Sequence, residues 1–171
     1  MTTSSGRTSK KGGALIESVM MMPLILSLLI GTIELARVFY TYYTLEKVMA
    51  DLARYIGTQQ GVNFCDGTDA TVAAAKNMAL TGTTDGSGTP IVPNLTIDQI
   101  QIRIERFQTA TSDLAECGCD ATSCDIANGG QGPDWVVVSI ADGYPIKLVF
   151  WGLAPDPFPL RPSVRLPFTG T

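Results

Sequence analysis

The stretch Lys10-Lys11-Gly12-Gly13-Ala14-Leu15-Ile16-Glu17, followed by an apolar run over residues 18–33, decides the fold of this chain. A basic, polar leader meets a membrane-length segment at a pair of glycines, and Glu17 lies a few residues inside the apolar side. A charge at the centre of a membrane helix costs about 2.5–3.5 kcal/mol, and less near the end. Since spanning a bilayer does not require Glu17, we expect this carboxylate to have a role of its own. The alternative is a solvated glutamate among lipid head groups.

Residues 15–33 predict a membrane-spanning helix. They number 19, close to the roughly 20 apolar residues that a hydrocarbon core requires. No A-x-A cleavage pattern follows, so the segment is predicted to be a retained anchor rather than a removed secretory signal. The leader carries Arg7, Lys10 and Lys11 and no acidic residue. This bias favours a cytoplasmic leader and a carboxy-terminal domain outside the cytoplasm.

The predicted helix continues past the membrane segment, because neither proline nor glycine interrupts residues 32–56 and Gly57 is a plausible stop. Apolar residues recur there in steps of three and four, which is the spacing of one continuous helical stripe. The stripe consists of Leu35, Val38, Tyr42, Leu45, Met49, Leu52 and Ile56. It suits packing against the helices of other subunits, and it suits equally well packing onto the chain's own globular domain. Both interpretations stay open at this point.

Glu34 and Arg37 lie just outside the apolar run, at positions i and i+3 of the predicted helix, and can form an ion pair. We expect the pair to mark the outer boundary of the membrane. The alternative is a contact between neighbouring subunits, which is less favoured because surface ion pairs are common and individually weak.

The remainder of the chain predicts a small domain of mixed helix and strand. A short helix is expected over residues 71–80, with Thr68 or Asp69 as its amino-terminal cap and Gly82 at its end. Glycines and prolines over residues 81–93 then predict a turn-rich loop.

Four strands are expected after this loop. Residues 100–105 alternate between isoleucine and polar side chains, and residues 135–140 are apolar on both faces near their start. Weaker strand signals lie within residues 144–153 and 163–168, and prolines between them predict an extended, irregular connection. The fold class is therefore α+β, with a small antiparallel sheet packed against the outer half of the long helix.

Four cysteines, Cys65, Cys117, Cys119 and Cys124, lie in the domain that is predicted to be outside the cytoplasm. An even number in such a compartment favours two disulfides, and a bridge between Cys117 and Cys119 is the least favourable geometrically. Cys65 would then tie the end of the long helix to the loop over residues 108–134. The alternative is a four-cysteine zinc site, because C-x-C-x4-C is a plausible ligand spacing.

Composition argues against catalysis and against nucleic-acid binding. The chain of 171 residues has no histidine and a net charge of −4. Without histidine, Ser-His-Asp and Cys-His catalytic arrangements are excluded, and no nucleotide-binding or nucleophile-elbow motif is present. No cluster of lysine and arginine offers a face for phosphates. We therefore expect a protein that is not an enzyme, with no cofactor, no bound metal and no nucleic-acid partner.

The glycine pair, the apolar run and Glu17 together resemble the processing site of type IV pilin-like proteins. The resemblance implies that a prepilin peptidase cuts after a glycine and that a glutamate is the fifth residue of the mature chain. A cut between Gly12 and Gly13 makes Glu17 the fifth residue, whereas a cut after Gly13 places it one position too early. The resemblance also implies that Glu17 meets the new amino terminus of a neighbouring subunit, where each charge offsets the desolvation of the other.

Within that group the chain is most similar to the TadE-like family of the tight-adherence (Flp) pilus system. The blocks that carry the resemblance are Ala14-Leu15-Ile16-Glu17-Ser18-Val19, Met22-Pro23-Leu24-Ile25-Leu26, Gly31-Thr32-Ile33-Glu34-Leu35-Ala36-Arg37 and Asp51-Leu52-Ala53-Arg54-Tyr55. Ser18 departs from the aromatic residue that many relatives have after the glutamate, which would weaken recognition by the peptidase. The last five residues lack the polar, charged finish that is common in the family.

These observations predict a cytoplasmic leader over residues 1–12, a long helix over residues 13–57 that spans the membrane in its first half, and an extracytoplasmic α+β domain over residues 58–171. The predicted function is a structural, pilin-like subunit of a tight-adherence pilus, with other pilin subunits, the prepilin peptidase and membrane lipid as partners. Its predicted location is the inner membrane, in a single pass with a periplasmic domain, before entry into an extracellular pilus. The alternatives are a permanently membrane-anchored assembly or scaffold factor and a periplasmic zinc-binding module.

Overall fold

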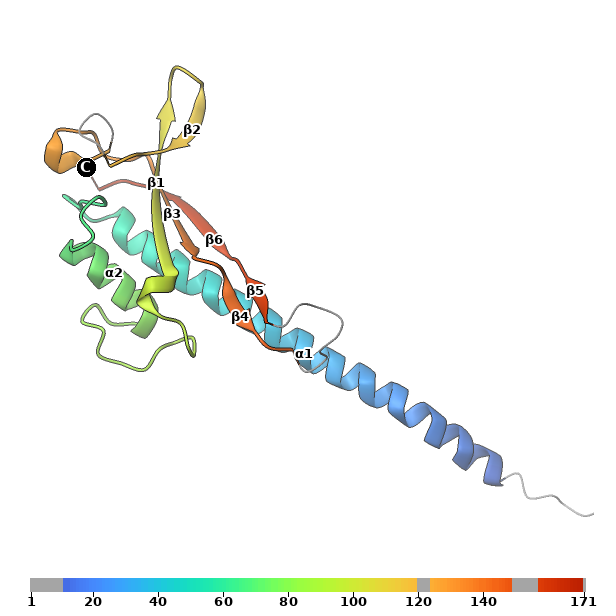
Figure 1. Ribbon diagram of the computed structural model, residues 1–171. Coiled ribbons are helices and arrows are strands. Elements are labelled where there is room, and N and C mark those ends of the chain that lie inside the picture. Colours follow the sequence, from blue (N-terminus) through green and yellow to red (C-terminus); the bar gives the residue numbers. More distant parts are fainter. Residues whose placement is uncertain (1–10, 120–123, 149–156, 171) are drawn as a thin grey trace, which may run out of the picture. The chain divides into compact units, whose positions relative to one another are not determined.

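The structure is a computed structural model that describes residues 11–119, 124–148 and 157–170 (Figure 1). Its architecture is α+β, with a long apolar helix followed by a small domain that contains antiparallel sheet, as the sequence predicts. In chain order the elements are α1 (Lys11–Gly57), α2 (Ala70–Thr81), the 3-10 turn η1 (Ile97–Gln99), β1 (Ile100–Gln108), β2 (Asp113–Glu116), the 3-10 turn η2 (Ile126–Asn128), β3 (Trp135–Ile140), β4 (Tyr144–Ile146), β5 (Phe158–Leu160) and β6 (Ser163–Pro167).

The chain divides into two compact units, Met1–Val38 and Phe39–Thr171. The amino-terminal unit, as far as the structure describes it, consists of the first part of α1. The carboxy-terminal unit holds the second part of α1 together with every other element. The helix passes through Pro23 and ends at Gly57, which confirms the predicted stop.

Helix α2 is bounded by the residues that local physical chemistry favours. A side-chain oxygen of Asp69 accepts hydrogen bonds from the backbone amides of Thr71 and Val72, at 2.8 and 3.0 Å. At the other end Gly82 has a left-handed φ of 80° and donates its N–H to a helix carbonyl. Of the two candidate caps, Asp69 is therefore the one used. The hydroxyl of Thr68 donates instead to the carboxylate of Asp66.

The main sheet has the strand order β2-β1-β3-β6, with antiparallel neighbours throughout. In its register Ile100 faces Ile140, Ile102 faces Val138 and Ile104 faces Val136. These residues share one side of the sheet because alternate side chains of a strand point the same way. This apolar side joins the buried face of α1 in the core of the carboxy-terminal unit. The core residues of α1 are Leu45, Val48, Met49, Leu52, Ala53 and Ile56.

The end of α1 is hydrogen-bonded to the residues that follow β6. The backbone N–H groups of Thr169 and Gly170 both donate to the carbonyl oxygen of Gly57, at 2.8 and 3.1 Å. A Cβ atom on Gly57 would lie 3.3 Å from the carbonyl oxygen of Pro167. The helix terminus and the residues after β6 thus satisfy each other's backbone groups.

The strand predictions were correct for β1, β3 and β6 and incomplete elsewhere. Strand β2 was not predicted, because its four residues carry no alternating apolar pattern and it forms by pairing with the far end of β1. Strand β5 lies in the segment that was predicted to be irregular. Pro159 is accommodated there opposite Pro145 in a two-stranded sheet with β4. The third expected strand ends at Ile146, and its predicted continuation over residues 149–153 lies outside the described residues.

All four cysteines form disulfides within the carboxy-terminal unit. Cys65 is bonded to Cys119, with their Cα atoms 5.4 Å apart, and Cys117 is bonded to Cys124, with Cα atoms 5.7 Å apart. The first bridge links the loop after α1 to the loop after β2, as expected for a cysteine that follows the long helix. Since the four sulfur atoms are paired with one another, no thiolate is left for the zinc-site alternative.

Candidate functional site

The residues of the expected processing site lie at the beginning of α1. Gly12 and Gly13 belong to its first turn, and Glu17 is four residues beyond Gly13. Positions i and i+4 of a helix lie above one another on the same face. Gly13 and Glu17 are both exposed, and no atom lies within 4 Å of the place that a Cβ on Gly13 would occupy. The glycine and the carboxylate are therefore accessible together on one side of the helix.

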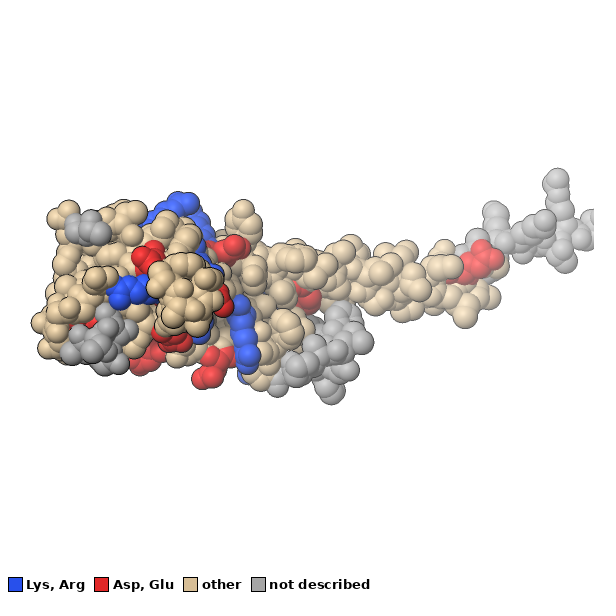
Figure 2. All heavy atoms as spheres, turned by 90° about the horizontal axis from the view of Figure 1, so that it is seen from above, with Lys and Arg blue, Asp and Glu red and all other residues tan. Residues whose placement is uncertain are grey.

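The amino-terminal unit exposes an apolar surface that it does not itself bury. Its best 18-residue window has a mean hydropathy of 2.1 and no buried residue, so by length and composition α1 is able to cross a membrane. On the face seen in Figure 2 this part of the helix is almost free of charged side chains, whereas charges of both signs are scattered over the carboxy-terminal unit. A surface of this size and polarity requires lipid or other apolar helices around it.

Two hydroxyl side chains of this segment are satisfied within the helix. The hydroxyl of Ser27 donates to the carbonyl of Leu24 at 2.8 Å, and that of Thr32 donates to the carbonyl of Leu28 at 2.9 Å. Hydroxyl groups that bond to the preceding turn leave no unpaired donor toward the surroundings. These residues are therefore compatible with an apolar environment.

Glu34 and Arg37 form the ion pair that their spacing predicts. Oε2 of Glu34 lies 3.8 Å from a guanidinium nitrogen of Arg37, and the glutamate side chain is much less exposed than the arginine side chain. The distance is at the long end for such a pair, and a largely exposed partner makes it individually weak. Its place, directly after the apolar segment, fits the expected boundary of the membrane.

The predicted stripe of α1 divides between two environments. Leu45, Met49, Leu52 and Ile56 are buried in the core of the carboxy-terminal unit, which is the second of the two interpretations left open by the sequence. Leu35 is 54% exposed and Tyr42 is 39% exposed, while Val38 is half-buried. In the folded chain, only the first three residues of the stripe keep surface that is not buried in the carboxy-terminal unit.

Sequence reasoning missed a group of exposed aromatic residues on α1. Tyr40 and Tyr43 are 76% and 75% exposed, and they border a hollow of about 520 Å³ between α1 and the loop after α2. The residues that line this hollow are Tyr40, Tyr43, Thr44, Lys47, Val48, Asp51 and Ile91. The signal in the sequence was the run Phe39-Tyr40-Thr41-Tyr42-Tyr43 directly after the apolar segment. Tyrosines in such positions are typical of membrane interfaces.

Comparison with known proteins supports the resemblance in the long helix. Residues 12–60 match a protein family model described as TadE: TadE-like protein. The matched region begins at Gly12 and covers Glu17, the apolar segment and the rest of α1. No curated protein and no solved structure matches the chain. The amino-terminal helix is thus similar to that of TadE-like proteins, and the match does not extend over the sheet.

Proposed function

We propose that this TadE-like protein is a structural subunit of a tight-adherence pilus, held in the membrane by α1 before assembly. The observation that carries the proposal is the coincidence, within the family match, of a glycine pair, a glutamate that is the fifth residue counted from Gly13, and an unburied apolar helix. The TadE-like family is pilus-associated and structural rather than enzymatic. A filament or a bilayer supplies the apolar surroundings that the amino-terminal unit lacks.

Processing by a prepilin peptidase would create an amino terminus at Gly13. The ammonium group at Gly13 and the carboxylate of Glu17 would then lie on one helix face, about one turn apart. In an apolar setting each of these charges needs a partner of opposite sign, because an unpaired ion there is strongly unfavourable. Pairing between subunits, Glu17 of one with Gly13 of the next, meets this need and sets their relative position along the helix axis.

The disulfides support a location of the carboxy-terminal unit outside the cytoplasm. Two bridges in one small domain are typical of oxidising compartments. The basic leader points the same way, since Arg7, Lys10 and Lys11 favour retention on the cytoplasmic side. We infer a single-pass inner-membrane protein with a periplasmic domain that later enters the pilus.

A permanently anchored assembly or scaffold factor is the second candidate. It is favoured by the burial of Leu45, Met49, Leu52 and Ile56 in the domain, which shortens the part of α1 available for contacts in a filament. Such a factor would keep its leader or remain in the membrane fraction after assembly.

The first experiment is to sequence the amino terminus of the protein extracted from native membranes that contain the peptidase. A chain that starts at Gly13 supports pilin-type processing. A chain that starts at Met1 or Thr2 contradicts it and leaves a single-pass membrane protein with an extracytoplasmic domain.

Replacement of Glu17 then separates the two candidates. We expect Glu17→Gln to leave membrane insertion unchanged and to lower incorporation into pili at least about tenfold, because one partner of a desolvated ion pair is lost. The matched control is Glu46→Gln, an exposed position of the same helix in the carboxy-terminal unit. Incorporation of both variants at the wild-type level would contradict the role of Glu17. Absence of the wild-type protein from purified pili would favour the scaffold factor.

A further inference from the structure

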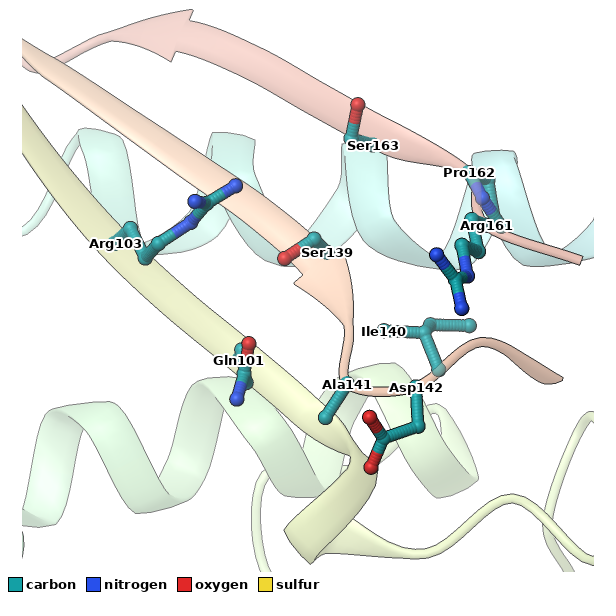
Figure 3. A pocket seen from close by; sticks show the side chains of 9 residues that line it. All are labelled: Gln101, Arg103, Ser139, Ile140, Ala141, Asp142, Arg161, Pro162 and Ser163. Carbon is teal, nitrogen blue, oxygen red and sulfur yellow. The ribbon is translucent and has the colours of Figure 1, made fainter.

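The outer side of the main sheet carries a polar hollow of about 330 Å³, which is near the lower end of the size range of ligand pockets. Figure 3 shows the side chains that line it. They come from β1, from β3 and the turn after it, and from the first residue of β6 and the two residues before it. The polar ones are Gln101, Arg103, Ser139, Asp142, Arg161 and Ser163.

The strand register explains why these side chains meet. Gln101 is paired with Ser139 across β1 and β3, and Ser139 is paired with Ser163 across β3 and β6. Cross-strand partners have Cβ atoms about 4.5–5.5 Å apart. Arg103 follows Gln101 by two residues and points to the same side of the sheet, away from the core. A row of neutral hydrogen-bonding groups thus lies next to a guanidinium group.

Arg161 is held in place by tightly packed neighbours. A Cβ on Gly143 would lie 2.9 Å from Cγ of Arg161 and from Cβ of Pro159, so the turn after β3 approaches this segment closely. Gly143 has a left-handed φ of 82°, which only glycine adopts readily. Leu160 and Pro162, on either side of Arg161, are buried. The arginine therefore projects from a backbone that has little freedom to move.

Arg103 is similarly supported. Its cross-strand partner is Val137, which also faces Arg165 on the other side. Val137 is only 6% exposed although it lies on the outer side of the sheet. Such burial is expected where the aliphatic stems of neighbouring arginines lie along the sheet and keep their charged ends in solvent. The side chain of Arg103 lines the hollow.

The two arginines of the hollow have no ion-pair partner in the described part of the chain. Arg165, the next arginine on this side, forms an ion pair of 2.8 Å with Glu105. Neither Arg103 nor Arg161 forms an ion pair or a hydrogen bond with any residue in the ranges that the structure describes. Asp142 lines the same hollow without pairing with either arginine. Two free guanidinium groups on a chain with a net charge of −4 are suited to an anionic ligand.

The other side chains narrow the choice of anion. Gln101, Ser139 and Ser163 offer neutral donors and acceptors, and Asp142 is an acceptor for hydroxyl groups but repels a bare oxyanion. The remaining lining residues are the apolar Ile140, Ala141 and Pro162. We propose that this hollow binds an acidic oligosaccharide, with one carboxylate at Arg103, another at Arg161, and hydroxyl groups at Gln101, Ser139, Ser163 and Asp142.

The test is a binding titration of the full-length protein in nonionic detergent, with trigalacturonate as the probe and neutral maltotriose as the comparison. We expect trigalacturonate to bind and maltotriose to bind at least about tenfold more weakly, because the charge-assisted hydrogen bonds are missing. Arg103→Gln and Arg161→Gln should each weaken binding of trigalacturonate at least about tenfold. The control Arg54→Gln removes the same charge from an exposed position on α1 outside the hollow and should leave the affinity unchanged.

A further variant distinguishes a saccharide from a simple oxyanion. Asp142→Asn should weaken binding of trigalacturonate, whereas it should strengthen any binding of inorganic sulfate or phosphate. The proposal is overturned if trigalacturonate does not bind at millimolar concentration, or if Arg54→Gln weakens binding as much as the two hollow variants. Sulfate that competes as well as the trisaccharide would show an oxyanion site and contradict the saccharide assignment. None of these readouts depends on pilus assembly or on leader processing.

Discussion

Asp69 illustrates how a single side chain sets the start of an element in this protein. Its carboxylate accepts hydrogen bonds from the backbone amides of Asn63, Thr71 and Val72. Burial alone would raise the pKa of Asp69, but these hydrogen bonds outweigh it and hold the pKa below its ordinary value. The ionised carboxylate thus joins the loop after α1 to the first turn of α2.

We predict that Asp69→Ala lowers the free energy of unfolding by about 1 kcal/mol at neutral pH, the usual cost of removing a helix cap. The measurement is thermal unfolding of the full-length protein in detergent, followed by circular dichroism. Thr68→Ala is the matched control, since Thr68 was the other candidate cap, and its effect should stay within about 0.5 kcal/mol. An equal loss in both variants would contradict the assignment of the cap.

The pH dependence of this contribution has a definite sign. Because the folded state holds the pKa of Asp69 below its unfolded value, ionised Asp69 stabilises the folded domain. The contribution is fully present above the unfolded pKa of about 3.9 and is lost as the pH falls through the lower, folded pKa. The difference in stability between the wild type and Asp69→Ala should therefore shrink on acidification. A difference that grows below this range would contradict the hydrogen-bond explanation.

At the scale of elements, α1 serves two purposes along its length. Its last turns present one apolar face to the sheet, and the residues of that face are fully buried. Its earlier turns are apolar without being buried, so their sequence reflects surroundings outside the folded domain. One periodic stripe in the sequence thus covers residues with different structural roles.

This division predicts opposite effects for two leucines of the stripe. Leu52 is completely buried, and Leu52→Ala should lower the free energy of unfolding of the domain by about 2–5 kcal/mol. Leu35, which is 54% exposed, should change stability by less than about 0.5 kcal/mol when it is replaced in the same way. Unfolding experiments on both variants measure the change in domain stability, and the amount of each variant recovered in pili measures its incorporation. We expect Leu35→Ala to lower pilus incorporation without unfolding the domain, and equal stability losses would contradict the division.

At the scale of the whole molecule, the two units depend on different sources of stability. The amino-terminal unit has no buried apolar core in its described part, so its apolar residues are left to surroundings outside the folded domain. The carboxy-terminal unit has a core of helix and sheet, and its loops between β2 and β3 are held by the two disulfides. Small extracytoplasmic domains commonly use disulfides in this way.

The two disulfides should contribute unequally to the stability of the carboxy-terminal unit. The Cys65–Cys119 bridge closes a separation of 54 residues and the Cys117–Cys124 bridge one of 7. Loop-closure entropy then predicts losses of about 4 and about 2 kcal/mol when each pair is replaced by serine. Chemical denaturation of the two double variants, each with the other bridge intact, provides the comparison. A larger loss for the Cys117–Cys124 variant would contradict an entropic origin of the difference.

Features that depend on nearby residues were predictable from the sequence. The ends of α1 and α2 at Gly57 and Gly82 follow from the conformational freedom of glycine at helix termini, and the cap of α2 was limited to Thr68 or Asp69 by their position before an alanine run. The strands β1 and β3 were predictable because their apolar residues repeat with the period of a strand. The apolar segment and the Gly12–Gly13–Glu17 arrangement likewise lie within a short stretch of chain.

Features that depend on residues far apart in the chain were not predictable from the sequence. Strand β2 exists because the end of β1 offers it a partner, and β5 because β4 does. The cysteine pairing was left among alternatives, since spacing along the chain does not determine which Cα atoms come within bonding distance. The hollow lined by Arg103 and Arg161 combines residues from three parts of the chain, so no local pattern in the sequence indicates it.

The sequence by itself determined the long helix, the apolar segment that follows its glycine pair and the α+β class of the domain, because periodicity, helix caps and apolar length are local properties. Only the tertiary structure decided which residues of the α1 stripe are buried, which cysteines are bonded and which arginines share a hollow. These outcomes depend on strand register and on the packing of helix against sheet, which bring together residues far apart in the chain.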